Sequence, residues 1–169
     1  MAHHAGMTAI QRNQPPPIVI EPARLSDIDD IVAIENQAYR FPWSRSLLLA
    51  EINGEKFSYV YVARLQQDSS VPQKMIGYNY FWVVSDEVHI LNLAVAPDYQ
   101  RQGYGRQLME FALDFGRERG ATSAFLEVRA SNTIALQLYT KSGFFQIGIR
   151  KKYYGGEEDA YVLKKRLSD

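Results

Sequence analysis

Two glycines one residue apart, between two arginines, form the clearest binding signal in this chain. They lie in QRQGYG, residues 100–105, between an apolar run and a run with helical periodicity. A strand that passes through a glycine-rich turn into a helix presents unpaired N–H groups and the positive end of the helix dipole. Gly103 and Gly105 have no side chains that would keep an anion away from the backbone, and Arg101 and Arg106 supply charged donors. The segment predicts an anion site; the alternative is a turn that needs glycine only for its geometry.

The residues after this loop exclude two common nucleotide sites. A Walker-type loop ends in Gly-Lys-Ser/Thr, whereas Gly105 is followed by Arg106 and Gln107. A dinucleotide fingerprint requires a third glycine three residues after the second, where this chain has Leu108. The regular strand–helix alternation of a dinucleotide-binding domain is also absent from the pattern. A different pyrophosphate carrier remains as the ligand.

Glu127 and Tyr139 are downstream side chains suited to proton transfer. Glu127 lies near the end of the apolar run AFLEVRA, where a carboxylate is a candidate base, and the alternative is an ion pair with Arg129 or Lys141. Tyr139 follows apolar residues at helical spacing, so it is either a proton donor or a core ring. A phenol remains protonated at neutral pH. Asn132 suits a helix N-cap.

A single domain over residues 18–169 is expected to position these residues, after a disordered leader at residues 1–17 that contains three consecutive prolines. Strands are expected at residues 18–23, 57–65, 75–84, 87–95, 122–128, 144–154 and 159–167, and helices at residues 28–39, 45–53, 106–119 and 132–142. This order predicts an α/β (α+β) fold with a mixed sheet and helices on both faces.

Helix starts are predicted from capping residues. Ser26 with Asp29 resembles an N-cap pair for the first helix, and Ser44 suits the second. Ser131 or Asn132 is expected to cap the last helix.

Composition excludes several classes of function. Lysine plus arginine equals aspartate plus glutamate at 19 each, so net charge indicates no nucleic acid partner. The chain has no cysteine, which excludes disulfides, thiolate nucleophiles and cysteine zinc sites, and no constellation of metal ligands is apparent. No apolar run approaches the roughly 20 residues of a membrane span, and the first residues lack a signal core. A cytoplasmic protein without membrane contact is expected, with residues 1–6 before Met7 interpreted as a remnant of expression.

Several motifs in order resemble one family. Gln100, Gly103 and Gly105 after LNLAVAPDY resemble the acetyl-coenzyme A loop of the GCN5-related N-acetyltransferases (GNAT), and the order of elements is similar over nearly the whole chain. LEVRASNTIALQLYTKSGF, with FPWS, YY and EDA, resembles the RimI-type N-terminal alanine acetyltransferases. The resemblance implies a mostly antiparallel sheet and acetyl-coenzyme A as cosubstrate. It implies coenzyme contacts from Leu93, Ala94, Val95, Arg101, Gln102, Gly103, Tyr104, Gly105, Arg106 and Asn132.

The same resemblance implies direct transfer of acetyl to the N-terminal alanine of a small-subunit ribosomal protein. Glu127 then falls on the position of the proton acceptor, and Tyr139 on that of the donor to the coenzyme sulfur. Acceptor contacts are expected from two aromatic segments: Phe41, Pro42, Trp43, Tyr153, Tyr154 and Glu158. Aromatic and acidic residues there favour a cationic peptide. The alternatives are acetylation of a lysine or a small amine, and a non-catalytic acyl-coenzyme A-binding module.

Overall fold

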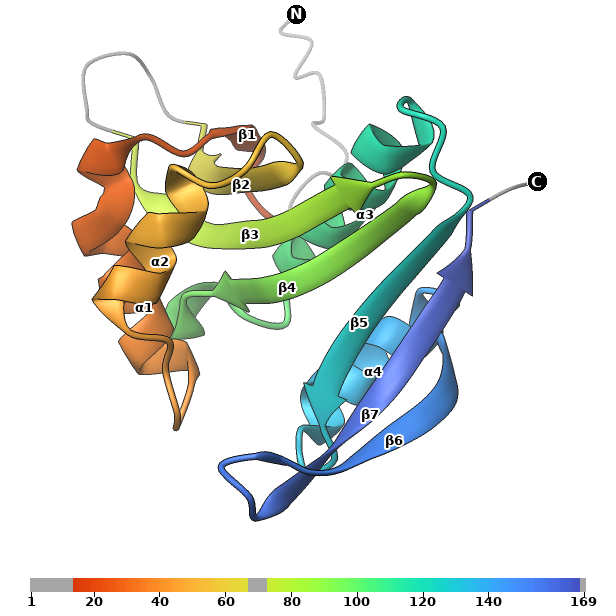
Figure 1. The fold of residues 1–169 in the computed structure, drawn as a ribbon. Coiled ribbons are helices and arrows are strands. Elements are labelled where there is room, and N and C mark those ends of the chain that lie inside the picture. Colours follow the sequence, from red (N-terminus) through yellow and green to blue (C-terminus); the bar gives the residue numbers. More distant parts are fainter. Residues whose placement is uncertain (1–13, 67–72, 168–169) are drawn as a thin grey trace, which may run out of the picture.

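The computed structural model describes residues 14–66 and 73–167. Within them, seven strands form one sheet that helices flank (Figure 1). The strands are β1 (Ile18–Pro22), β2 (Ser58–Leu65), β3 (Met75–Val84), β4 (Glu87–Val95), β5 (Ser123–Arg129), β6 (Phe145–Tyr154) and β7 (Glu158–Arg166). The helices are α1 (Ile28–Ala38), α2 (Arg45–Ile52), α3 (Tyr104–Arg117) and α4 (Thr133–Lys141), with 3-10 turns η2 (Leu25–Asp27) and η3 (Pro97–Tyr99).

The sheet is mixed and mostly antiparallel, which confirms the predicted fold class. The strand order is β1-β2-β3-β4-β5-β7-β6, and only β4 and β5 pair in parallel. The expected hairpin of β2 and β3 and the closing hairpin of β6 and β7 are both present. Part of the connection between β2 and β3 lies outside the described residues.

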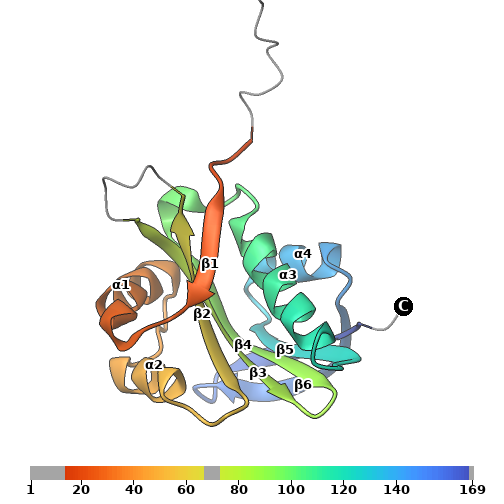
Figure 2. The same cartoon turned by 90° about the horizontal axis from the view of Figure 1, so that it is seen from above.

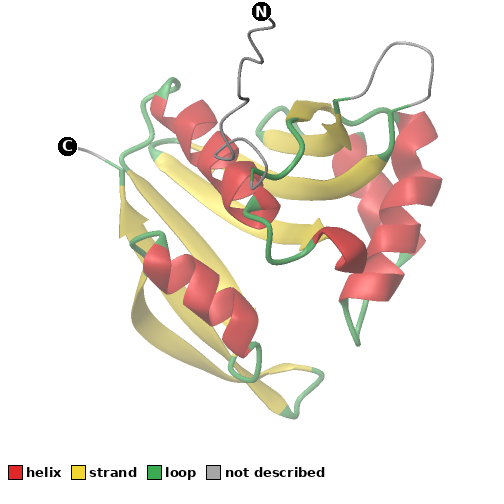
Figure 3. Ribbon diagram, turned by 180° about the vertical axis from the view of Figure 1, so that it is seen from behind, coloured by secondary structure: helices red, strands yellow, loops and turns green. Residues whose placement is uncertain are grey.

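The helices cover the sheet from both sides. Viewed from above, α1 and α2 lie on one side and α3 and α4 on the other (Figure 2). Ile31 and Leu48 pack with Tyr78 and Tyr80 under the first pair of helices. Under the second pair, seen from behind in Figure 3, Leu108 and other apolar residues of α3 and α4 form a larger core. The sheet is therefore held between two apolar layers.

The parallel pair β4 and β5 separates halfway along its length. Pairing runs only from Glu87 with Ser123 to Ile90 with Leu126, after which the two strands diverge (Figure 1). Opposite β3, the register of β4 shifts by one residue at Leu91. A bulge of this kind bends the strand and increases its local twist, so the bulge accounts for the divergence. The second half of β4 is thereby left with an open edge.

Two of the predicted helix caps are confirmed and one is wrong. The Ser44 hydroxyl accepts from Leu47 N at 3.2 Å, and Asn132 Oδ1 accepts from Ala135 N at 3.1 Å. Ser26 does not cap α1, because it lies inside the 3-10 turn η2 that precedes the helix. There the Asp27 carboxylate accepts from the backbone N–H of Arg24 at 2.8 Å.

The described chain attaches to the domain just before β1. The Pro16 carbonyl accepts from the Tyr104 hydroxyl at 2.7 Å, and the Pro17 carbonyl accepts from Gln66 N at 2.9 Å. The rest of the expected leader, residues 1–13, lies outside the described residues.

Candidate functional site

The open edge of β4 offers backbone donors to a ligand. The carbonyl oxygens of Leu93 and Val95 point to this edge, where they accept from the Tyr39 hydroxyl and, at 3.0 Å, from Gln100 Nε2. In a strand that pairs antiparallel on its other side, the N–H of a residue points the same way as its carbonyl. The N–H groups of Leu93 and Val95 therefore face the opening beyond the last parallel pair at Ile90.

The glycine loop presents a second group of donors at the start of α3. Among the described residues, the N–H groups of residues 103–106 have no partner, and the first helical bond runs from Gln107 N to the Gly103 carbonyl at 3.1 Å. Gly103 has φ of 89°, the left-handed region that favours glycine. A Cβ on Gly103 would meet nothing within 4 Å, so the loop is open at this residue. The loop therefore has the geometry of an anion cradle at a helix N-terminus.

This cradle lies against the open edge of β4. A Cβ on Gly105 would lie 3.6 Å from Leu138 Cδ2 in α4, and 3.8 and 3.9 Å from the side chains of Val95 and Leu93. These are ordinary van der Waals distances, so α3 begins in close contact with both elements. The loop, the strand edge and α4 form one continuous region.

The residues predicted to contact the coenzyme differ in which of their groups can reach it. The side chains of Arg101 and Arg106 are exposed and can approach an anion, whereas the exposed Gln102 side chain donates from Nε2 to the Asp98 carbonyl at 3.2 Å. The Tyr104 side chain is fully buried and bonds to Pro16, so only its N–H faces the cradle. Asn132 uses its side-chain oxygen as the cap of α4.

Glu127 lies on β5 beyond the point where β5 leaves β4. Its carboxylate is about a quarter exposed and forms an ion pair of 3.0 Å with Arg150 Nε of β6. The partners considered from the sequence, Arg129 and Lys141, are therefore wrong. A hydrogen bond to Glu127 is the main cause that raises the pKa of the Tyr153 phenol. Glu127 is thus a partly hydrated carboxylate with one cationic neighbour.

Tyr139 lies on α4 among other tyrosines. Burial, and then the proximity of Tyr154, raise its pKa to about 12, so its phenol remains protonated at neutral pH. Burial also raises the pKa of Tyr154 to about 12, with the Glu127 charge as the second cause. The pKa of Tyr39 is raised well above its usual value by burial and by Tyr139. These mutual effects indicate that the Glu127 carboxylate and the three phenols lie close together. The Tyr39 hydroxyl also donates to the Leu93 carbonyl at the open edge of β4, so these groups and the strand edge form one site.

Arg129 joins the two aromatic segments predicted to contact an acceptor. Its guanidinium carbon lies 4.8 Å from the ring centre of Phe41, in the loop between α1 and α2, and 4.1 Å from that of Tyr154 on β6. Cation–π contacts of this kind are attractive. Pro42 is exposed beside Phe41, whereas Trp43 packs edge-on against Tyr80 at 5.9 Å.

The carboxylates near the acceptor side are paired within the chain. Glu158 bonds to Arg129 at 3.1 Å and to the backbone N–H of Ser131 at 3.0 Å, and the bonds to Ser131 are the main cause that lowers its pKa. Asp159 accepts from the backbone N–H of Lys152 at 2.8 Å. Asp159 also pairs with Lys151 at 3.2 Å, and Glu127 with Arg150, so these ion pairs offset much of the negative charge expected to favour a cationic peptide.

The geometry combines a carboxylate, a protonated phenol, backbone donors and an anion cradle around one opening. The family model described as the acetyltransferase (GNAT) family matches residues 28–144, which is more than half of the chain. The chain belongs to the GNAT acetyltransferase family. Enzymes of this fold use acetyl-coenzyme A.

GNAT relatives share most of the chain's length. The ribosomal protein bS18-alanine N-acetyltransferase of Escherichia coli K12 is 39% identical over 146 residues, or 85% of this chain and 93% of that protein. A protein of Bacillus subtilis 168 with the same description, marked putative, is 34% identical over 83% of this chain and 89% of its own length. The crystal structure of the ribosomal-protein-alanine N-acetyltransferase from Escherichia coli matches with a TM-score of 0.77 and 35% identity, over 90% of this chain and 96% of that one.

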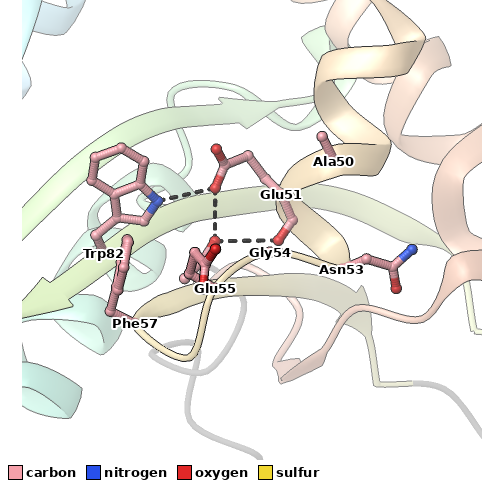
Figure 4. A pocket seen from close by; sticks show the side chains of 8 residues that line it. Ala50, Glu51, Asn53, Gly54, Glu55, Phe57 and Trp82 are labelled. Carbon is pink, nitrogen blue, oxygen red and sulfur yellow. Dashed lines mark hydrogen bonds between the residues drawn. The ribbon is translucent and has the colours of Figure 1, made fainter.

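Another concave feature of this GNAT domain is separate from the site. A pocket of about 450 Å³ lies between the end of α2 and the sheet, where Glu51 accepts from Ser58 Oγ at 2.7 Å and from Trp82 Nε1 at 3.0 Å (Figure 4). None of the predicted site residues lines it. Over the described ranges, no group of three or more acidic, histidine or cysteine residues could hold a metal, and no helix is long and apolar enough to cross a membrane.

Three residues of the candidate site were not predicted from the sequence. Tyr39 directly follows α1, and Arg129 and Arg150 lie on β5 and β6; each contacts a residue distant in sequence. Tyr39 lies at the end of a predicted helix beside the FPWS motif, which is the only local signal. Arg150 carries no such signal, because its meeting with Glu127 depends on the pairing of β5, β7 and β6.

Proposed function

We propose that this chain acetylates the α-amino group of an N-terminal alanine, on a ribosomal protein, with acetyl-coenzyme A as donor. The observation that carries the proposal is the opening between β4 and β5, with an anion cradle at one end and Glu127 and Tyr139 beside it. The identity of the substrate class follows the relatives named for alanine acetylation of bS18. Because ribosomal proteins are found in the cytoplasm, we expect the enzyme to act there.

The free donors fit the shape of acetyl-coenzyme A. In this proposal, the N–H groups of residues 103–106 bind the pyrophosphate, with Arg101 and Arg106 adding charge. The N–H groups of Leu93 and Val95 extend the contacts along the pantetheine arm, parallel to the open edge. One of them polarises the thioester carbonyl as negative charge develops on its oxygen.

Transfer requires movement of two protons. Glu127, directly or through a water, takes a proton from the acceptor ammonium, and the freed amine attacks the thioester carbon. The C–N bond forms as the C–S bond breaks, and Tyr139 supplies a proton to the departing thiolate. The second proton, which the nitrogen loses as it becomes an amide, returns through water to the Tyr139 phenolate. The pKa of about 12 keeps Tyr139 in the protonated form that this role requires. With no cysteine in the chain, a cysteinyl acyl-enzyme is excluded.

The acceptor is proposed to lie between the loop of Phe41, Pro42 and Trp43 and the segment of Tyr153 and Tyr154. Their aromatic surfaces supply apolar contact near the amine. Since Glu158 is already paired with Arg129, its proposed role is to hold Arg129 between the two segments.

Peptide acetylation by the purified protein tests the proposal. A peptide with a free N-terminal alanine is compared with an N-blocked peptide that carries one lysine, each with acetyl-coenzyme A. Turnover of the free N-terminus alone supports the proposal. Turnover of the lysine peptide alone would assign a different acceptor, and coenzyme binding without turnover of any amine would indicate a binding module. Glu127→Gln should lower kcat by about 100-fold or more, the usual contribution of a general base.

A further inference from the structure

Glu35 is a buried carboxylate that the proposed mechanism does not use. It lies on the last turns of α1, and the residue is 1% exposed. Burial is the main cause that raises the pKa of this carboxyl. In the described part of the chain, no lysine, arginine or histidine forms an ion pair with it. A buried acid without a cation is costly to keep, so its contacts require an explanation.

The Glu35 carboxylate connects three separate elements. One oxygen accepts from the backbone N–H of Trp43 at 2.7 Å, in the loop between α1 and α2. The other accepts from Asn92 Nδ2 of β4 at 2.9 Å and from the Tyr78 hydroxyl of β3. The loop that is proposed to contact the acceptor is therefore tied through one side chain to the strand proposed to contact the thioester.

Tyr39, four residues after Glu35, makes a second contact between the end of α1 and β4. Residues four apart lie on the same face of a helix, and Glu35 and Tyr39 contact the consecutive β4 residues Asn92 and Leu93. The end of α1 is thus attached to β4 next to the bulge and at the Leu93 carbonyl on the edge that faces away from β3. These contacts set the position of the following loop relative to the open edge.

We propose that Glu35 is a positioning residue that holds the acceptor loop, residues 40–44, in register with the open edge of β4. The inference rests on the proposed function for the identity of the acceptor. Its effect falls on acceptor binding, because the Trp43 N–H is the loop's contact with Glu35, whereas the anion cradle is on α3. A residue that served only to attach α1 to the sheet would affect stability alone.

Three variants separate these roles. Glu35→Gln retains an oxygen for the Trp43 N–H, and the side chains of Tyr78 and Asn92 can reorient toward the amide. Glu35→Met keeps similar length and removes every acceptor. Leu113→Ala, in the fully buried part of α3, is the control for a general loss of stability. Two measurements are made on each: steady-state kinetics with an alanine peptide, and backbone hydrogen exchange at residues 40–44.

We expect the three variants to give different results. Glu35→Met raises the acceptor KM about tenfold or more, as for loss of a hydrogen bond to a charged group, with the KM for acetyl-coenzyme A within about twofold, and it speeds exchange at residues 40–44. Glu35→Gln remains within about threefold of the wild type, and Leu113→Ala changes the melting temperature alone. Unchanged acceptor KM and unchanged loop exchange in Glu35→Met would overturn the inference, as would a Glu35→Gln as impaired as Glu35→Met. If the wild type acetylates no peptide, the proposed function fails, and the exchange experiment still decides whether Glu35 tethers the loop.

Discussion

Replacing Tyr139 with phenylalanine removes one oxygen atom from the site and retains the ring. The ring packs edge-on against Phe144 at 5.9 Å, and the residue is 8% exposed. Within the described part of the chain, the hydroxyl makes no hydrogen bond, so its loss should change the free energy of unfolding by less than about 1 kcal/mol. For a chain of this size, that corresponds to a shift in Tm of at most about 2–4 °C. The variant therefore tests chemistry separately from folding.

The expected kinetic effect is much larger than the effect on stability. Loss of a positioned general acid typically lowers kcat about 10²–10⁴-fold, which is about 3–5 kcal/mol of the activation barrier. Because the pKa of Tyr139 is about 12, roughly one molecule in a thousand has lost this proton at pH 9. Ionisation of Tyr139 should therefore not limit the wild-type rate at or below that pH.

Release of coenzyme A, followed with a thiol reagent, is a direct assay. The chain has no cysteine, so the protein contributes no background thiol. Tyr59→Phe is a matched control, since Tyr59 stacks on Phe81 on the α3 face of the sheet at 5.6 Å. A folded Tyr139→Phe with kcat within about threefold of the wild type would refute the reasoning, and the hydroxyl of Tyr39 would be the next donor to test.

Three further predictions concern other parts of the site. Gly103→Ala should raise the Kd for coenzyme A about tenfold by calorimetry, because alanine disfavours the left-handed φ of this residue by about 1–2 kcal/mol and so disfavours the loop conformation that presents the free N–H groups. Unchanged affinity would place the coenzyme elsewhere. Arg129→Leu should raise the acceptor KM by about fivefold, since cation–π contacts are worth about 1 kcal/mol, with coenzyme affinity unchanged; an equal loss of both affinities would contradict the bridging role. Burial raises the folded-state pKa of Glu35, so the folded protein binds the proton more tightly than the unfolded chain and loses stability as pH rises above the usual value near 4.5. Urea unfolding should then show the stability of the wild type relative to Glu35→Gln falling from pH 5 to pH 8, and a constant difference would show that the pKa is not raised.

Much of the fold could be predicted because its signals are local. The apolar spacing of Leu108, Ala112 and Phe115 matches the buried face of α3, and the two closing strands pair as expected. Ser44 and Asn132 cap their helices because a short polar side chain can reach the N–H three residues ahead. The cap predicted at Ser26 failed, because the chain makes a 3-10 turn there and the Asp27 carboxylate bonds backward to Arg24.

The site was less predictable because its contacts cross the sheet. Glu127 and Tyr139 were selected by resemblance, but neither spacing nor composition indicated that Arg150 pairs with Glu127. The Arg129 bridge between Phe41 and Tyr154 joins residues from three elements. The buried Glu35 lies in a stretch whose pattern predicts only a helix.

The sequence by itself determined the elements, the glycine cradle and the types of side chain available for proton transfer, because periodicity, backbone freedom and acidity are properties of residues and their near neighbours. Only the tertiary structure decided where β4 leaves β5, which carbonyls are already bonded and which carboxylates are already paired. These depend on strand register, in which a shift of one residue at Leu91 changes which backbone groups remain open.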